Sequence, residues 1–208
     1  MTYRQKKRVL DLFVAITLII IFLPFWIVIP ILITLDTGRP VIFKHKRVGK
    51  NGEEFWIYKF RSMIPNAQRV LELKYPDLYQ KFKAGDWKIE AKSDPRITKL
   101  GRLIRAFTID EFPQLFNVLK GEMSMVGPRA YVKEELDEQM EKFPETKKYR
   151  KKILSVKPGI TGIWQTSGRN EIPFIKRAKI DSSYATEKSI KQDIIILLKT
   201  PQAMLSKW

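Results

Sequence analysis

The chain has 208 residues, with 39 Lys and Arg against 22 Asp and Glu and a formal net charge of +17. This length suits one ordinary domain with an appendage, and the charge predicts an anionic partner: nucleic acid, an acidic membrane surface or a phosphorylated substrate. The lack of cysteine excludes disulfides and cysteine-based zinc sites, and a single histidine, His45, excludes a multi-histidine metal site. The many Phe and Trp residues favour a membrane interface, although composition alone leaves nucleic acid open.

An uncharged apolar segment of 24 residues, Leu12–Leu35, follows a basic N-terminus. As a helix it would extend roughly 36 Å, enough to cross a bilayer. Pro24 falls in its middle and would kink a helix, and Lys and Arg flank both ends, as is typical of cytoplasmic flanks. Two topologies stay open, a straight span and a re-entrant helix that bends at Pro24, and the flanking charges favour the second.

A β-hairpin is predicted next. Val41–Phe43 and Phe55–Tyr58 are rich in β-branched and aromatic residues, and Gly49–Gly52 has turn chemistry. The second strand leads into Lys59 and Arg61. These two cations could contact phosphate, or they could equally be solvated charges at the end of a strand.

Amphipathic or charged helices are predicted in the rest of the chain, at residues 66–82, 100–107, 113–120 and 131–152, with an apolar run at 194–198. The basic helix at 100–107 and the run at 194–198 could lie on a membrane surface or pack on the core. The stretch 131–152 has an acidic first half, a basic second half and Pro144 between them. It indicates a solvated helix pair and not a site.

The adjacent carboxylates Asp110 and Glu111 are the first candidate site, because they stand in a strongly basic chain between Arg105 and Arg129. Arginines neutralise phosphate oxygens, while carboxylates hold a metal ion or attack phosphorus. The combination therefore predicts a site that handles phosphate together with a divalent cation.

A structural interpretation of the same residues competes with this one. Thr108 and Glu111 have the spacing of a helix capping box. Pro113 weakens that interpretation, because a helix begun at Thr108 would need its missing N–H, whereas proline suits the first position of a helix. The carboxylates are then expected at a junction between a loop and a helix.

A glycine-rich stretch, residues 158–165, is the second candidate site. Glycines and a threonine let backbone N–H groups approach a phosphate or a nucleotide. The residues expected to form such a loop are Pro158, Gly159, Thr161, Gly162 and Gln165.

Together these motifs resemble those of the bacterial sugar transferases, the monotopic phosphoglycosyl transferases that act on polyprenyl phosphate. The resemblance rests on motifs in the family's order: Lys7–Asp11 with Pro24, KFRSM at 59–63, DEFPQLFNVLKGEMSMVGPR at 110–129, and PGITG-x-x-Q-x-x-GR at 158–169. Leu23 departs from it, because the family usually has Ser before the helix-breaking proline. Almost the whole chain is covered.

The resemblance implies an α+β fold, mainly helical. It implies a re-entrant membrane helix over residues 1–36 and a cytosolic domain over residues 37–208 that carries a small β-hairpin sheet and interfacial amphipathic helices. The expected protein is a small monotopic enzyme at the cytoplasmic face of the bacterial inner membrane. It would transfer a sugar-1-phosphate from a UDP-sugar to undecaprenyl phosphate, releasing UMP and starting glycan assembly. Membrane lipids and downstream glycosyltransferases are the other expected partners, and nucleic acid is not.

Roles for individual residues follow from the same resemblance. Asp110, ionised at pH 7 with an ordinary pKa near 4, would attack the β-phosphorus to form a phosphosugar–aspartyl intermediate, and Glu111 and Asp110 would hold Mg²⁺. The expected phosphate-binding residues are Arg105, Arg129, Arg169, Lys59 and Arg61. The rival functions are a non-catalytic membrane-surface protein that binds anionic lipid and a nucleic-acid binder; neither gains from paired carboxylates between arginines.

Overall fold

The computed structural model describes residues 1–84, 89–168 and 172–205. The helices are α1 (Tyr3–Ile21), α2 (Phe25–Thr37), α3 (Ala67–Lys74), α4 (Pro76–Ala84), α5 (Lys99–Ala106), α6 (Gln114–Lys120), α7 (Lys133–Lys142), α8 (Lys147–Ile153), α9 (Ile163–Ser167), α10 (Phe174–Glu187) and α11 (Ile190–Leu205). The strands are β1 (Ile42–Val48), β2 (Glu54–Phe60), β3 (Ser124–Val126) and β4 (Gly159–Thr161). Mainly helical with small sheets, the fold agrees with the α+β class.

The N-terminal apolar segment forms two helices, α1 and α2, which are bent by 64° relative to each other. Pro24 is the N-cap residue of α2, a position where its missing N–H costs nothing. The break predicted at Pro24 is therefore confirmed. In the described part of the chain no single helix is long and apolar enough to cross a membrane, and the α1–α2 pair meets that standard only when both helices are taken together.

Polar side chains near the start of α1 fasten this helix to the rest of the protein. Asp11 accepts a hydrogen bond from the hydroxyl of Ser124 at 2.8 Å, and Lys7 forms ion pairs with Asp11 at 3.1 Å and with Asp193 at 3.4 Å. Arg8 donates to two carbonyl groups near the C-terminal end of α6, at 2.6 and 2.8 Å. The basic residues before the apolar segment are thus specific contacts as well as flanking charges.

Strands β1 and β2 form the predicted antiparallel hairpin, with Phe43 opposite Lys59. Directly opposed residues share one face of a sheet and alternate residues share it along a strand. Lys59 therefore lies on the same face as Phe43 and Arg47. Phe60 lies on the other face, where its ring is 5.6 Å from that of Trp26 in α2.

The second sheet is parallel and was not predicted from the sequence. In it β3 pairs with β4, Ser124 opposite Gly159 and Val126 opposite Thr161. The backbones come very close here, because a Cβ atom on Gly159 would lie 2.1 Å from the backbone nitrogen of Gly127. Glycine at these positions allows the two segments to touch.

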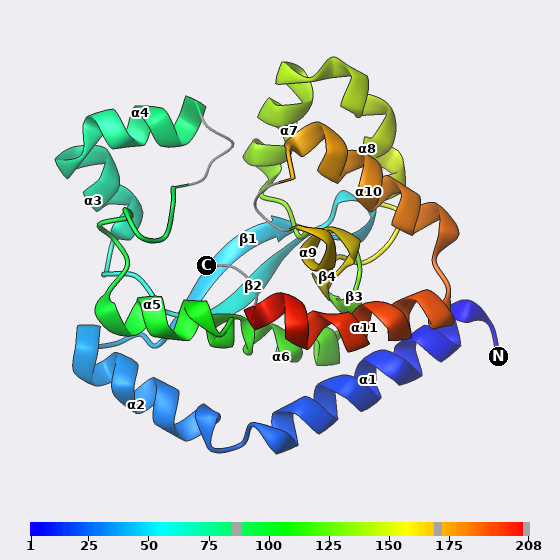
Figure 1. The fold of residues 1–208 in the computed structure, drawn as a ribbon, viewed down its shortest axis with the longest axis horizontal. Coiled ribbons are helices and arrows are strands. Elements are labelled where there is room, and N and C mark those ends of the chain that lie inside the picture. The colour runs from blue at the N-terminus through cyan, green and yellow to red at the C-terminus, as the bar shows by residue number, and fades with distance from the viewer. Residues whose placement is uncertain (85–88, 169–171, 206–208) are drawn as a thin grey trace.

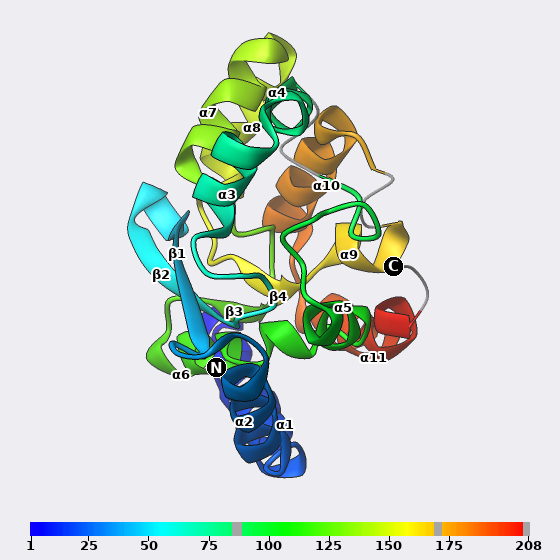
Figure 2. The same cartoon turned by 90° about the vertical axis from the view of Figure 1, so that its left-hand side faces the viewer.

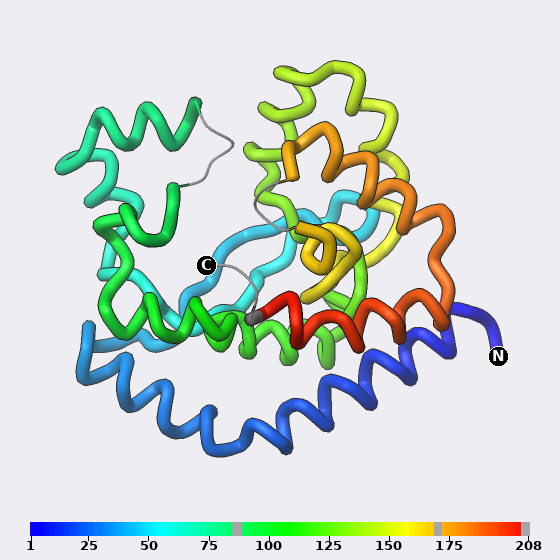
Figure 3. Tube along the Cα trace, in the orientation of Figure 1, coloured from blue at the N-terminus to red at the C-terminus, as the bar shows by residue number. Residues whose placement is uncertain are grey.

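Helices α1, α2, α5, α6 and α11 lie together on one side of the molecule (Figure 1), and this side carries many exposed apolar side chains. Helices α1 and α2 form a shallow V at the bottom of the molecule in the tube view (Figure 3), and α5, α6 and α11 lie just above them in two orthogonal views (Figures 1 and 2). Exposed apolar side chains gather on these helices, among them Phe13, Ile20, Leu23, Ile27, Ile31, Leu35, Leu103, Phe107, Phe116, Ile195 and Leu198. Leu103 belongs to the helix that the sequence assigned either to a membrane surface or to the core, and Phe116, which we expected to be buried with Leu115, Val118 and Leu119, is exposed.

Candidate active site

Asp110 and Glu111 lie in one 3₁₀ turn, η2 (Ile109–Glu111), between α5 and α6. Thr108 has a left-handed backbone with φ of 56°, and its side chain forms no capping hydrogen bond, so the capping-box interpretation is wrong. Pro113 is the N-cap residue of α6. The carboxylates therefore stand at the junction between a loop and a helix, as the position of this proline predicts.

The carboxylate of Asp110 is buried, and one of its oxygen atoms lacks a hydrogen bond from the described residues. Its residue is 4% exposed, and its Oδ1 atom has no hydrogen-bond partner among the residues that the structure describes. Burial raises the pKa of Asp110 to about 6; Lys59 and Arg105 act in the opposite direction, and the charge of Glu111 adds to the increase. The carboxylate is still mostly ionised at pH 7, but with a much smaller margin than its ordinary pKa predicts.

Glu111 forms an ion pair with Lys59, whose Nζ lies 2.6 Å from its Oε1. Lys59 comes from the end of β2, so the hairpin delivers a cation to the acidic turn. Its charge also lowers the pKa of Asp110. Lys59 is therefore not a solvated charge at the end of a strand, while its contact with phosphate stays a prediction.

The other predicted phosphate-binding arginines are placed differently from one another. The Nε of Arg105 donates to Ser62 at 2.8 Å, and its charge lowers the pKa of Asp110. Arg61 is buried and donates to carbonyl groups at the C-terminal end of α2, which gives it a structural role. Contact between Arg61 and phosphate stays a prediction, and Arg169 lies outside the described residues.

Arg129 has partners on several sides. Its guanidinium lies over the ring of Trp164, 5.5 Å from the centroid, and its Nε is 3.8 Å from a carboxylate oxygen of Glu135. Burial alone would lower the pKa of Arg129, but nearby groups, including the carboxylates of Glu135, Glu111 and Asp181, raise it above its ordinary value. Arg129 is therefore within electrostatic range of Glu111 in the acidic turn η2.

Glu135 is the residue of this region that sequence analysis missed. It is buried and lies within 3.9 Å of Arg47, Arg129 and Arg177. The stretch 131–152 forms the predicted helix pair, but the solvated-face interpretation is wrong for Glu135. The signal was present in the spacing, because Glu135 shares a helical face with Leu136, Gln139 and Met140, which are buried as well.

Asp181, in α10, is a second buried carboxylate behind Arg129. It accepts hydrogen bonds from the Tyr131 hydroxyl at 2.9 Å and from the backbone N–H of Arg129 at 3.3 Å. Burial raises the pKa of Asp181 to about 7, against the opposing effects of these hydrogen bonds and of Arg177. Asp181 thus anchors the backbone of the segment that carries Arg129.

The glycine-rich stretch is packed against the chain itself. The N–H of Gly159 donates to a backbone carbonyl after β3 at 2.9 Å, and the carbonyl of Thr161 accepts from Gly127 at 2.9 Å. A Cβ atom on Gly162 would lie 2.3 Å from the Gly127 carbonyl oxygen. The close approach that requires glycine is therefore an internal one, while the buried Gln165 Oε1 lacks a hydrogen-bond partner among the described residues. Nucleotide binding by Pro158 and the rest of this stretch stays a prediction.

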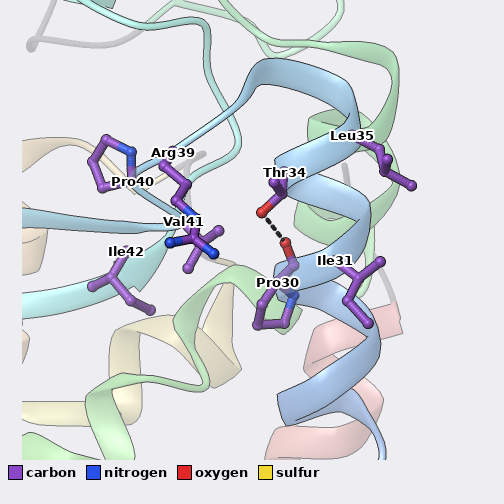
Figure 4. A pocket seen from close by; sticks show the side chains of 8 residues that line it. All are labelled: Pro30, Ile31, Thr34, Leu35, Arg39, Pro40, Val41 and Ile42. Atoms are coloured by element: carbon purple, nitrogen blue, oxygen red, sulfur yellow. Dashed lines mark hydrogen bonds between the residues drawn. The ribbon is translucent and has the colours of Figure 1, made fainter.

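An apolar groove of about 560 Å³ lies beside the C-terminal half of α2 (Figure 4), lined by Pro30, Ile31, Thr34, Leu35, Arg39, Pro40, Val41 and Ile42. Arg39 is the charged residue of this lining. The Thr34 hydroxyl donates to the carbonyl of Pro30 at 2.8 Å, inside α2. Asp110 and Glu111 do not line this groove, so it is separate from the candidate active site.

A buried carboxylate beside a second one, with lysine and arginine nearby, is the arrangement that the sequence predicts for a site that handles phosphate groups. The sequence profile described as bacterial sugar transferase matches residues 2–207. The chain belongs to this family.

Named relatives agree with this membership. The chain is 43% identical over 207 residues to the undecaprenyl-phosphate galactose phosphotransferase of Salmonella typhimurium, and 40% identical over 206 residues to the UDP-galactose-lipid carrier transferase of Erwinia amylovora. Each match covers 98% of this chain but 41% of the relative, so the chain spans about two fifths of these proteins. The exopolysaccharide production protein ExoY of Rhizobium meliloti is 36% identical, over 98% of this chain and 87% of its own length.

Proposed function

We propose that the protein transfers a sugar-1-phosphate from a UDP-sugar to undecaprenyl phosphate and releases UMP. The observation that carries this proposal is Asp110, a buried carboxylate with an unpartnered oxygen among the described residues, flanked by Lys59 and Arg105. The names of two relatives support the two substrates, since one contains UDP-galactose and a lipid carrier and the other contains undecaprenyl phosphate.

The proposed reaction has two displacements at one phosphorus atom. An oxygen of Asp110 bonds to the β-phosphorus while the bond from that phosphorus to the bridging oxygen breaks, and UMP leaves with the bonding electrons. An oxygen of undecaprenyl phosphate then attacks the same phosphorus and expels the aspartate. Lys59, Arg105 and Arg129 would stabilise the charge on the phosphate oxygens.

Asp110 and Glu111 are the residues proposed to hold Mg²⁺. No group of three or more His, Cys, Asp or Glu suited to a metal occurs in residues 1–84, 89–168 and 172–205. Two carboxylates nevertheless fit, because Mg²⁺ is commonly held by one or two carboxylates together with substrate phosphates and water, and the Oδ1 of Asp110 lacks a partner among the described residues. Bound there, the ion would offset the charge of the diphosphate.

The proposal places α1 and α2 in the cytoplasmic leaflet of the inner membrane as a re-entrant pair. The 64° bend, the exposed apolar side chains of both helices and the row of α5, α6 and α11 above them support this arrangement. Since the chain has no cysteine, Thr2→Cys and Ser189→Cys are clean topology probes. Both should resist an impermeant thiol reagent in intact cells and react after lysis; labelling of position 2 alone would contradict the re-entrant arrangement.

The activity is tested by measuring UMP release with a panel of UDP-sugars, undecaprenyl phosphate and Mg²⁺. We expect labelled sugar-phosphate to be trapped on the protein when the lipid is omitted, and Asp110→Asn to lose both trapping and turnover. Asp77→Asn, an exposed carboxylate of α4, is the matched control. Turnover that survives in Asp110→Asn would exclude the covalent route, and the absence of UMP release with every sugar would argue for the non-catalytic lipid-binding alternative.

A further inference from the structure

We propose that Glu135 is a positioning residue, which holds Arg129 so that the end of its guanidinium group is presented to the substrate phosphate. This inference rests on the proposed function, because it requires a phosphate-bearing substrate beside Glu111. Glu135 comes from α7, which is distant in sequence from the catalytic turn. Its carboxylate lies 3.8 Å from the Nε of Arg129, and we expect it to act on the reaction mainly through this arginine.

Arg129 is fixed at one end and open at the other. Its Nε faces Glu135 at 3.8 Å, its plane lies over Trp164, and its backbone N–H is bonded to Asp181. Its two terminal nitrogens make no hydrogen bond to any residue that the structure describes, and 28% of its side chain stays exposed. An arginine offers five N–H donors, and those of the two terminal nitrogens are left available here. The open end therefore suits a ligand that accepts hydrogen bonds, such as a phosphate.

Glu135 lies among three arginines, each held in a different way. Arg47 donates to the carbonyl of Ala130 at 3.1 Å, and Arg177 is enclosed by the rings of residues 131, 164 and 174. Burial lowers the pKa of Arg47 to about 10, and the nearby charge of Arg129 contributes to the decrease, as expected for two like charges close together. The Glu135 carboxylate is the anion that all three share. Without it, the repulsion between Arg129 and Arg47 would be unopposed at this point, and we expect the side chain of Arg129 to move.

The geometry also predicts which contact matters for catalysis. Arg47 and Arg177 have other restraints, whereas the side chain of Arg129 has Glu135 as its ion-pair partner and Trp164 as its stacking partner. Loss of the Glu135 charge should therefore act mainly through Arg129, and loss of both residues should cost little more than loss of Arg129. This is the pattern expected when two residues function as a unit.

The test is a double-mutant cycle with kcat/KM for UMP release as its measurement. We expect Glu135→Gln to lower kcat/KM by roughly 10- to 100-fold in the wild-type background and by less than about 3-fold in Arg129→Ala. Glu134→Gln is the matched control, because Glu134 is the exposed neighbour on the same helix, and it should leave kcat/KM unchanged. The dissociation constant of UDP, measured by calorimetry, should rise in Glu135→Gln and Arg129→Ala by similar factors.

A second variant covers the case in which Glu135→Gln fails to fold, since three buried cations would lose their counter-charge. Glu135→Asp keeps the charge but shortens the side chain, and it should fold with an intermediate kcat/KM. A folded variant with wild-type kcat/KM, or fold-losses that multiply with those of Arg129→Ala, would overturn the positioning role. Wild-type protein that releases no UMP would overturn the proposed function, whereas activity that is intact in Arg129→Ala would overturn only the role of this arginine.

Discussion

Two aspartates are almost equally buried but differ in how well their carboxylates are hydrogen-bonded. Asp11, 3% exposed, accepts hydrogen bonds from Ser124 and from the backbone N–H of Met125 and pairs with Lys7. Asp110, 4% exposed, keeps an oxygen without a hydrogen-bond partner in the described structure, and its pKa rises to about 6. A buried charge that is fully bonded holds elements together, whereas one that is poorly bonded is a candidate for chemistry.

The largest difference between the two aspartates is expected in turnover. Asp110→Asn removes the proposed nucleophile and should lower the rate of UMP release by roughly 10³-fold or more. Asp11→Asn keeps the catalytic turn and should leave the rate per folded molecule within about 3-fold of wild type. A stopped assay of the UMP released per folded protein molecule measures the rates of both variants. Equal losses in the two variants would show that burial alone, and not position, explains the effect.

The second difference is in stability, and the two variants should move it in opposite directions. Asp11→Asn weakens a bonded buried charge and should cost about 1–3 kcal/mol of unfolding free energy. Burial disfavours the charged form of the Asp110 carboxylate. Asp110→Asn removes this charge, so it should stabilise the fold by up to about 3 kcal/mol at pH 8. Denaturation in detergent, followed by circular dichroism, compares the two. A destabilised Asp110→Asn protein would contradict the poorly bonded state assigned to this carboxylate.

The sign of the Asp110 effect also fixes its pH dependence. Because the folded-state pKa is raised from 3.8 to about 6, the folded protein binds this proton more tightly than the unfolded chain does. Its stability should fall as the pH rises from 4 to above 6. The advantage of Asp110→Asn over wild type should therefore be close to zero at pH 4 and complete above pH 6. An advantage that does not depend on pH would point to packing instead.

These contrasts show which features the sequence could reveal. The acidic pair, the hairpin and the break at Pro24 depend on local signals: adjacent carboxylates, turn residues and a proline that fixes its own backbone. Glu135 and Asp11 acquire their meaning from partners far away in the chain, for example Asp11 from Ser124. Local pattern predicts an element and its polar residues, but it does not reveal which of the charges will be buried together.

The two glycine-containing regions show the same limit. The turn after β1 was predicted because Gly49–Gly52 has turn chemistry, and Gly52 has a positive φ of 85°, which glycine adopts readily. The glycines of residues 158–165 were expected to approach a ligand, yet Gly159 approaches Gly127. Both patterns indicate close contact of the backbone. Only the three-dimensional structure shows whether the contact is made with another part of the chain.

Catalysis itself should report the pKa of Asp110. Since the nucleophile must be ionised, kcat/KM should fall tenfold per pH unit below about pH 6 and level off above pH 7. The measurement is the pH profile of UMP release between pH 5 and 8, with a substrate whose own ionisation is known. A profile that stays flat down to pH 5 would mean that the pKa of Asp110 is near its ordinary value in the assayed enzyme, either because burial does not raise it or because Mg²⁺ bound beside it lowers it.

The smallest expected effect tests what Lys59 does for Asp110. The positive charge of Lys59 lowers the pKa of Asp110, so Lys59→Gln should move the acid limb of the profile to higher pH by roughly half a unit to one unit. If Lys59 also binds phosphate, the variant should lower the rate at every pH. Such a uniform loss does not move the midpoint of the acid limb, so it can be distinguished from the change in the pKa of Asp110. Lys44→Gln, an exposed lysine on the opposite face of β1, is the matched control and should move neither. A midpoint that is unchanged, or that falls, would contradict the electrostatic role of Lys59 while leaving its ion pair with Glu111 as a structural contact.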